Sequence, residues 1–297
     1  MIYPIDLHIH SSHSNDGTYE PRELVRMAKA AGLKVMAVAD HDAITAVADA
    51  VDEADKIGIT CIPCMEVDCA YKGVNLHVLA YGIDHTHRDW FDWEEMFLDR
   101  GRATAQEKIV LMNALGFHLT REDLDPYAFH GTYTGELFAE VLLSKEEYKD
   151  HPLLKPYRPG GERSVNPLVA FYWDFFSQGK PCYTESGPLP TLDEALSLIK
   201  RHGGVPVLAH PGNNLKGRYE LFDELVKEGI MGVEAFSSYH DAAATQYFLQ
   251  KGKEMDLLIT CGSDYHGKVK PAIALGQTGC TIPLFEMEES LKRYGLL

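Results

Sequence analysis

The stretch IDLHIH, residues 5–10, opens the chain and runs directly into the polar segment SSHSNDG, residues 11–17. An extended strand turns alternate side chains to opposite faces, so His8 and His10 are expected on one face and the apolar residues between them on the other. Two imidazoles on one strand face, followed by a turn that carries Asp16, are typical of the start of a metal site. The same pair could also be two histidines buried in a core, and the rest of the chain decides between these interpretations.

Composition indicates a globular protein with a large core. The chain has 297 residues, of which 45% are apolar, and it is long enough for one large α/β domain or two smaller ones. No run approaches the roughly 18 apolar residues of a membrane helix, and the start lacks a signal-sequence pattern, so we expect a cytoplasmic protein without a membrane partner. Six cysteines in this length do not indicate a disulfide framework, and Cys61 and Cys64 are expected to pack as ordinary side chains.

The charge balance limits the partners. The 28 basic and 44 acidic residues give a net charge of −16, which repels nucleic acid and argues against binding of a long duplex. A small anionic substrate remains compatible with this charge if metal ions supply local positive charge. No obligate protein partner is evident.

The order of elements is typical of a mostly parallel sheet covered by helices. Between residues 90 and 185 the alternation of strands and helices is lost. A long helix at about 93–115 leads into a segment rich in Tyr, Phe, His, Pro and Gly. That segment is interpreted as an insertion. Elsewhere the pattern predicts strands at 5–10, 34–39, 59–65, 75–83, 205–209, 230–235 and 257–260, and helices at 21–31, 43–56, 191–202, 219–228 and 241–252.

Side chains with metal chemistry recur where these strands end. In parallel α/β barrels the carboxyl ends of the strands form one rim, and active sites lie there. Nine nitrogen or oxygen donors without a thiolate suit two or three ions with a shared carboxylate, and Mn, Fe or Zn rather than Ca. The nine candidate ligands are His8, His10, Asp16, His41, Glu66, His77, His210, Asp264 and His266.

The motifs DLHIHSSHSNDG, VADHD, CMEVD, AHPG and GSDYH, in this order, resemble the polymerase and histidinol phosphatase (PHP) family. The resemblance implies a metal-dependent phosphoesterase on a distorted seven-stranded (β/α) barrel with a three-metal site. It further implies a barrel made of residues 1–90 and 186–297, with residues 91–185 inserted as a mostly helical lid.

The resemblance also distributes the ligands among the ions. The first ion would be held by His8, His10, Glu66 and Asp264. Glu66 would bridge to a second ion, which His77 and His210 complete. Asp16, His41 and His266 would hold the third, with His13 as a rival. Relatives usually have Ser where this chain has Asn15, a departure that should matter little for coordination.

The chemistry expected from such a site is hydrolysis of a phosphoester by a hydroxide that bridges two metal ions. Glu66, Asp264 and His210 are the catalytic candidates, and His210 or a metal-bound water could give a proton to the leaving group. Asp40 and Asp42 could each orient a ligand imidazole. Asp42 could equally cap a helix that begins at Ala43.

The substrate is less defined by the sequence. The family subgroup with a helical lid resembles phosphatases of nucleoside 3',5'-bisphosphates, which usually carry a Thr-Arg-x-His-Phe-Ala-Arg stretch. The comparable residues 133–140 keep Thr134, Phe138 and Ala139 but lose both arginines, and Glu136 and Glu140 would repel a phosphate. Other candidates for phosphate binding are Arg100, Arg102, Arg158, Arg163 and Lys180, although each could instead be a solvated surface side chain. Tyr127, Phe129, Tyr133 and Trp173 could stack on a base or form a small core.

The expected function is therefore hydrolysis of a small phosphorylated metabolite: a nucleotide, a nucleoside bisphosphate or a sugar phosphate, as a monoester or a cyclic diester. Two alternatives stay open. One is an amidohydrolase-like binuclear hydrolase, although the bridging lysine common in such sites is not evident at a strand end. The other is a non-catalytic metal-binding PHP module, although a degenerate site should have lost several of the nine ligands.

Overall fold

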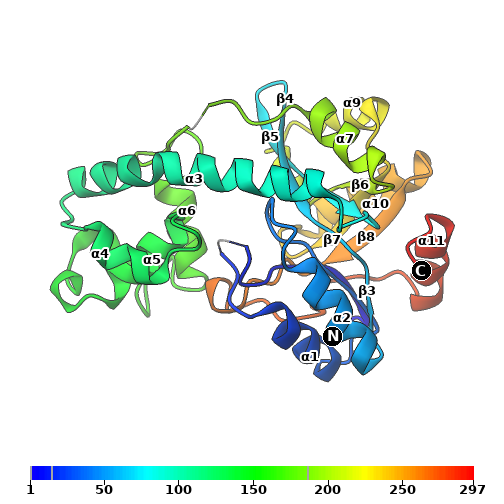
Figure 1. The fold of residues 1–297 in the computed structure, drawn as a ribbon, viewed down its shortest axis with the longest axis horizontal. Helices are drawn as coiled ribbons and strands as arrows, with labels where there is room; N and C mark the ends of the chain where they lie inside the picture. The colour runs from blue at the N-terminus through cyan, green and yellow to red at the C-terminus, as the bar shows by residue number, and fades with distance from the viewer. Residues whose placement is uncertain (1, 15, 186) are drawn as a thin grey trace.

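A computed structural model describes residues 2–14, 16–185 and 187–297, and it shows a mixed α/β fold (Figure 1). The amino-terminal strands form a small parallel sheet in the order β1-β2-β3, with β1 at Ile5–Ile9, β2 at Val35–Val38 and β3 at Thr60–Cys61. Every residue of β1 and β2 is buried, as expected for strands covered on both faces.

A second sheet contains the remaining described strands in chain order. They are β4 (Glu66–Tyr71), β5 (Val74–Tyr81), β6 (Val205–Leu208), β7 (Gly232–Ser237) and β8 (Leu258–Gly262). The β4–β5 and β5–β6 pairs are antiparallel, whereas β6–β7 and β7–β8 are parallel. The antiparallel β4–β5 pair follows from the short turn between Tyr71 and Val74, because a hairpin needs only a few residues and a parallel crossover needs a dozen or more.

The two sheets meet at their edges through single bridges. One bridge joins Ile9 to Tyr265 and the other joins His41 to Glu66. The hydrogen-bonded ladders of the described residues therefore form two sheets, and they do not by themselves establish the closed seven-stranded barrel expected from the sequence.

Glu66 begins a strand rather than following one, which differs from the strand expected at 59–65. The ladder of β3 stops near Ile62, whose N–H donates to the carbonyl of Met36. Glu66 then opens β4 beside the end of β2. The carboxylate still reaches the same edge of the fold, since His41 follows β2 there.

Helices cover the sheets. Helix α2 begins at Val47, four residues later than expected from Ala43, and the carboxylate of Glu94 accepts the N–H groups of Ile44 and Thr45 in the turn before it. The other helices packed around the strands are α1 (Pro21–Ala30), α7 (Leu192–Arg201), α8 (Pro211–Asn214), α9 (Leu221–Glu228), α10 (Ala242–Glu254) and α11 (Leu284–Arg293), with a 3₁₀ turn η4 (Gly267–Val269).

Helix α3 (Arg88–Ala114) spans the molecule from the strands to a group of helices on the left of Figure 1. Its first turns bury Trp90 in the strand core, and its later turns bury Ile109 and Met112 in a second core. The remaining elements of that segment are α4 (Arg121–Leu124), η1 (Asp125–Tyr127), α5 (Gly135–Ser144), η2 (Glu146–Tyr148), η3 (Pro152–Tyr157) and α6 (Pro167–Phe175).

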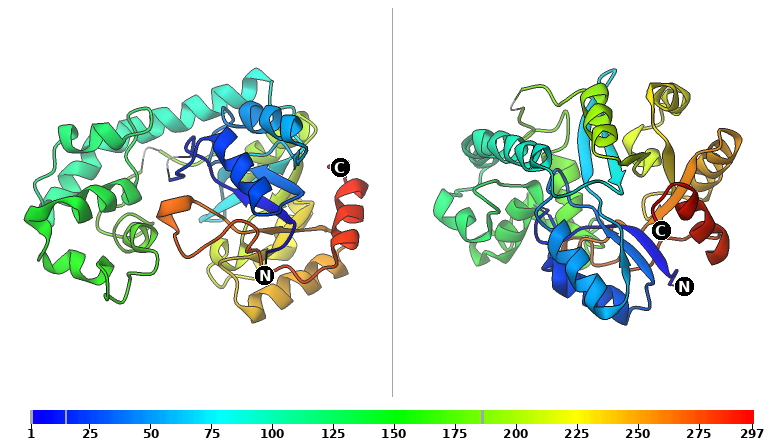
Figure 2. Two further views of the ribbon diagram at one scale, coloured as in Figure 1. Left: turned by 90° about the horizontal axis from the view of Figure 1, so that it is seen from below. Right: turned by 45° about the vertical axis from the view of Figure 1, so that its right-hand side comes forward.

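The helical segment thus has its own apolar core, which includes Phe138, Phe171 and Phe176 and takes in Val269 from η4. Tyr133 belongs to this core as well, so it packs rather than facing solvent. The division expected at residue 90 falls within α3, and the division at residue 186 lies outside the described residues. The views in Figure 2 separate the helical segment from the strands. No described helix is long and apolar enough to cross a bilayer.

Candidate metal centre

Glu66 is completely buried, and imidazole nitrogens surround its two carboxylate oxygens. Oε1 lies 3.0 Å from Nδ1 of His77 and 3.0 Å from Nε2 of His210. Oε2 lies 3.0 Å from Nε2 of His8 and 3.2 Å from Nδ1 of His41. One carboxylate is thereby placed between two sets of nitrogen donors, which is the arrangement a bridging ligand requires.

Two further groups adjoin this one. Oδ1 of Asp264 lies 3.1 Å from Nε2 of His10 and 3.5 Å from Nε2 of His8. Oδ2 of Asp16 lies 3.1 Å from Nε2 of His266 and 3.9 Å from Nε2 of His41. The structure therefore brings all nine candidate ligands together. The groups overlap, because His10 and His41 each belong to two sets of potential ligands, and the distribution among three ions stays a prediction.

The backbone around this centre is strained. His210, Asp42 and Asp264 have positive φ values of 22°, 49° and 55°, a region that side chains other than glycine rarely adopt. Such residues persist only where surrounding contacts over-determine them, and they concentrate at functional sites.

The charges of the acids and imidazoles depend on one another. Burial alone would raise the pKa of Glu66, but His8, His41 and His77 outweigh it and hold this pKa well below its usual range. Burial would likewise raise the pKa of Asp264, and the neighbouring cations, led by Lys270, hold it well below its usual range. Both carboxylates are therefore ionised at neutral pH, as metal ligands must be.

Unpartnered nitrogen atoms show that these residues fit metal ions. Among the described residues, buried Nε2 of His10 and Nδ1 of His41 make no hydrogen bond, although carboxylate oxygens lie 3.1 Å and 3.2 Å from them. Buried polar atoms are normally bonded, so a set of bare donors around shared carboxylates calls for a ligand that the chain does not supply. Imidazole and carboxylate donors suit Zn, Mn or Fe.

Glu234 is a functional residue that the sequence reasoning missed. It lies on β7 and is completely buried, with Oε1 3.0 Å from Nδ1 of His8 and Oε2 accepting the N–H of His210 at 2.8 Å. A hydrogen bond from Nδ1 leaves Nε2 of His8 free to face Glu66. The only signal in the sequence is one acid within the apolar strand GVEAFS.

Gly262 makes room for this contact. A Cβ at this position would lie 2.2 Å from Oε1 of Glu234 and 2.2 Å from Cβ of His8. The end of β8 can therefore approach the two site residues closely only because the side chain is absent.

Comparison with known proteins identifies a domain family. The PHP domain profile matches residues 6–152. The chain contains a PHP domain in these residues. It is 28% identical to a 5'-3' exoribonuclease of Haemophilus influenzae, over 96% of this chain and 99% of that protein, and 25% identical to a 3',5'-nucleoside bisphosphate phosphatase of Chromobacterium violaceum, over 92% and 91%. It is 26% identical to a phosphoribosyl 1,2-cyclic phosphate 1,2-diphosphodiesterase of Eggerthella lenta, over 89% and 94%.

Solved structures agree with this finding. A protein of Bifidobacterium adolescentis assigned as a metal-dependent phosphoesterase superposes with a TM-score of 0.76 at 25% identity, covering 97% of this chain and 96% of that chain. An amidohydrolase of Chromobacterium violaceum with bound sulfate and no metal shares the fold, with a TM-score of 0.78 at 23% identity over 97% of each chain.

Two acids in the PHP motifs have roles that differ from the expected ones. Asp40 accepts the N–H and the hydroxyl of Ser11, each at 2.6 Å, so it holds the loop after β1 rather than a ligand imidazole. Asp42 accepts the N–H of Asp68 and Nε1–H of Trp93, and it caps no helix because α2 begins at Val47. Both acids thus position backbone and side chains around His41.

Asp6 and His13 are two other residues near the PHP motifs. Asp6 accepts the N–H groups of Ser263 and Gly276 and ties β1 to the segment after β8. Nδ1 of His13 lies 2.8 Å from Oγ1 of Thr45. His13 does not belong to any of the groups of potential metal ligands. Asn15 lies outside the described residues.

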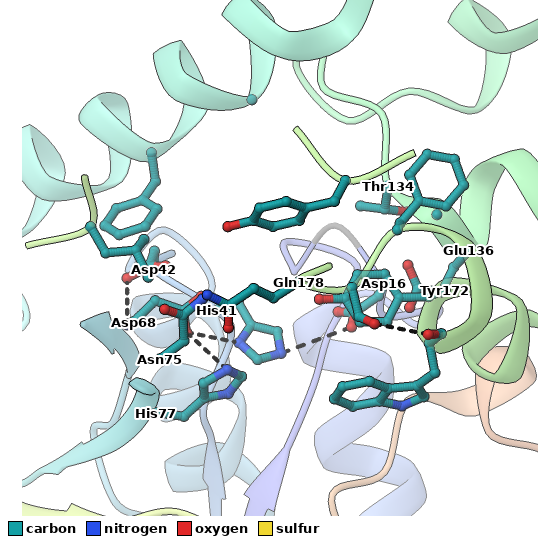
Figure 3. A pocket seen from close by; sticks show the side chains of 18 of the residues that line it. Asp16, His41, Asp42, Asp68, Asn75, His77, Thr134, Glu136, Tyr172 and Gln178 are labelled. Atoms are coloured by element: carbon teal, nitrogen blue, oxygen red, sulfur yellow. Dashed lines mark hydrogen bonds and ion pairs between the residues drawn. The ribbon is translucent and has the colours of Figure 1, made fainter. Parts of the chain in front are cut away.

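A pocket of about 590 Å³ adjoins the centre, and residues of the strand edge and of the helical segment line it. Figure 3 shows His41, His77 and Asp68 along one part of the wall and Asp16, Glu136 and Tyr172 along another. Asp68, which the sequence reasoning did not single out, has Oδ1 3.6 Å from Nε2 of His77.

Of the five cations considered for phosphate binding, Arg100 lines this pocket, where it donates to the carbonyls of Gly187 and Pro188. The lining does not include the other four. Arg102 contacts Glu95 and Asp99, Arg158 donates to the carbonyls of Leu143 and Tyr148, Arg163 pairs with Asp174, and the backbone N–H of Lys180 donates to the carbonyl of Ser177.

The two acids expected to repel phosphate are partly neutralised. Glu140 pairs with Nζ of Lys268 at 2.8 Å, which joins α5 to η4. Burial, reinforced by the charge of Asp16, raises the pKa of Glu136 to about 8, so its carboxyl group is largely protonated at neutral pH. Trp173, one of the aromatic candidates for stacking, lines the pocket.

Proposed function

We propose that this chain is a metal-dependent phosphoesterase that hydrolyses a small phosphorylated metabolite. The observation that carries the proposal is the placement of Glu66 between four imidazoles at 3.0–3.2 Å, at the edge of a cavity of about 590 Å³. A cavity of this volume is in the range that encloses a nucleotide-sized ligand.

Two to three divalent ions, Mn, Fe or Zn, are part of the proposal. His8, His10, Glu66 and Asp264 would hold the first, Glu66, His77 and His210 the second, and Asp16, His41 and His266 the third. When bound, such ions activate water as a nucleophile and neutralise the charge that develops on the phosphoryl oxygens. Glu234 contributes by fixing the ring nitrogen that His8 presents, because its carboxylate occupies Nδ1.

Catalytic roles are proposed for Glu66, Asp264 and His210. Nε2 of His210 lies against Glu66, so the ring is directed to the centre, whereas the backbone N–H is fixed by Glu234 at 2.8 Å. Glu66 and Asp264 remain ionised beside the imidazoles, which gives the site acceptors of constant charge over the neutral range.

The proposed substrate is a nucleotide, a nucleoside bisphosphate or a sugar phosphate, cleaved as a monoester or cyclic diester. Aromatic side chains in the lining, among them Phe97, Tyr172 and Trp173, provide surfaces for a base or sugar, and Arg100 provides a cation for phosphate. The net charge of −16 disfavours long duplexes in this open pocket, so we expect small esters in the cytoplasm as the substrates. Residues 91–185 would serve as the lid that supplies the wall of the pocket opposite the metal centre.

The test is release of inorganic phosphate from a panel of nucleoside and sugar phosphates and of cyclic diesters. Protein stripped by a chelator is reloaded with Mn, Fe or Zn and compared with Glu66→Gln, and Glu289→Gln on the surface of α11 serves as the matched control. We expect metal-dependent turnover that falls at least about 100-fold in Glu66→Gln and not in the control. Absence of turnover on every ester with two or more bound ions would overturn the proposal.

A further inference from the structure

Lys270 follows η4 and is a buried cation in the pocket wall, with 5% of its surface exposed. Its Nζ donates a hydrogen bond to Oδ2 of Asp264 and lies 4.6 Å from the centre of the Tyr239 ring. Burying an ammonium group is unfavourable unless it is paired, so this position is defined by a specific arrangement of partners.

The two oxygens of Asp264 face different groups. Oδ1 faces His10 and His8, at 3.1 and 3.5 Å from their Nε2 atoms, and Oδ2 faces Lys270. Lys270 therefore leaves one oxygen of Asp264 for the metal centre. Because that carboxylate is shared with the centre, it balances only part of the ammonium charge.

Lys270 differs from Arg100 and Lys108, two other cations that line the pocket. Arg100 and Lys108 belong to α3 and donate to backbone carbonyls, those of Gly187 and Pro188 for Arg100 and that of Tyr133 for Lys108. Lys270 instead comes from the strand edge and is bonded to a candidate metal ligand. An ammonium at this place has donors left for an anion that sits on the centre, since Lys carries three N–H groups.

We propose that Lys270 binds the phosphoryl group of the substrate, in addition to holding Asp264. This inference rests on the proposed phosphoesterase function and adds a residue to the site. A fixed cation next to the reacting group favours the transition state, in which charge spreads over the phosphoryl oxygens.

The experiment compares Lys270→Gln with Lys270→Arg and with Lys268→Gln. Gln can still donate to Asp264 but lacks the charge, whereas Lys268 is an exposed neighbour paired with Glu140 and serves as the control. For each reloaded protein we measure the dissociation constant of inorganic phosphate by calorimetry, the metal content, the thermal midpoint and kcat/KM on the best ester.

We expect Lys270→Gln to weaken phosphate binding at least about tenfold and to lower kcat/KM by about 100-fold, with the metal content and thermal midpoint of the parent. Lys270→Arg should retain part of the phosphate affinity, and Lys268→Gln should match the parent. Unchanged phosphate affinity in a folded, metal-loaded Lys270→Gln would overturn the inference, as would a loss that follows metal loss in both Lys270 variants.

Failure of the proposed function would look different. If the parent protein turned over no ester but bound inorganic phosphate in a way that Lys270→Gln abolished, the phosphoesterase proposal would fail and the Lys270 anion site would stand. If Lys270→Gln did not fold, the calorimetric comparison of Lys270→Arg with Lys268→Gln would decide, with equal phosphate affinity in these two counting against the inference.

Discussion

Oε1 of Glu234 lies 3.0 Å from Nδ1 of His8, on the far side of the ring from the nitrogen that faces Glu66. The same carboxylate accepts the N–H of His210 through its other oxygen. One residue of β7 thus orients two candidate ligands that come from different strands, and both of its oxygens are acceptors.

Glu234→Gln should weaken metal binding about 10- to 100-fold, because an amide has only one acceptor oxygen for the two donors. Metal retained after dialysis against a graded series of chelator concentrations measures this effect. Glu289→Gln, on the surface, should retain metal as the parent does, and equal retention by all three proteins would refute the orienting role of Glu234.

Arg100 and Arg102 lie two residues apart on α3 but contact different surroundings, which makes them a matched pair. Arg100→Gln should raise KM about tenfold, because it removes a cation from the pocket wall. Arg102→Gln should change KM less than about twofold, since its partners Glu95 and Asp99 are exposed on the same helix. Steady-state kinetics on one ester would show the difference, and similar KM values for the two variants would remove Arg100 from the site.

Glu136 should make stability depend on pH. Its pKa is about 8 in the folded protein and near the usual 4.5 when unfolded, so between these values the folded state holds a proton that the unfolded state has released. Its contribution is complete below pH 4.5 and is lost as the pH rises to about 8, with a slope of at most about 1.4 kcal/mol per pH unit.

Glu136→Gln removes this titration, so the variant should gain stability relative to the parent as the pH is raised from 5 to 8. Urea unfolding of chelator-treated protein at several pH values measures it. A difference between the two proteins that stays constant over this range would exclude the raised pKa.

Phe138 is completely buried in the second core, with its ring 5.0 Å from that of Phe176. Phe138→Ala should destabilise that core by about 3–5 kcal/mol. Because the strand core is a separate cluster, faster hydrogen exchange should concentrate in the helical segment from α4 to α6 and spare β1 and β8. Uniform acceleration over both regions would show that the two cores unfold as one unit.

The family and the nine candidate ligands could be predicted from the sequence because the pattern is local. Alternation places His8 and His10 on one face of a strand, and strands that end in His, Asp or Glu recur in order along the chain. Two helices could likewise be predicted from local signals. The helix at Pro21 has a proline in its first turn, and the helix after Thr191 has a Thr–Glu capping box.

The exact start of β4 and of α2 could not be predicted, because distant residues decide them. Glu94, from α3, accepts the N–H groups of Ile44 and Thr45 in the turn that precedes α2. The sheets also divide at edges that only single bridges connect, a feature without a local sequence signal.

The sequence by itself determined which residue types carry the chemistry, because strand periodicity and motif order can be recognised from the order of residues alone. Only the tertiary structure decided which partners serve them: Glu234 behind His8, Lys270 beside Asp264, and Arg100 in the pocket rather than Arg158 or Arg163. The physical reason is that hydrogen bonds and charges act over a few ångströms in space, whereas these partners lie far apart along the chain or on faces that local periodicity does not define.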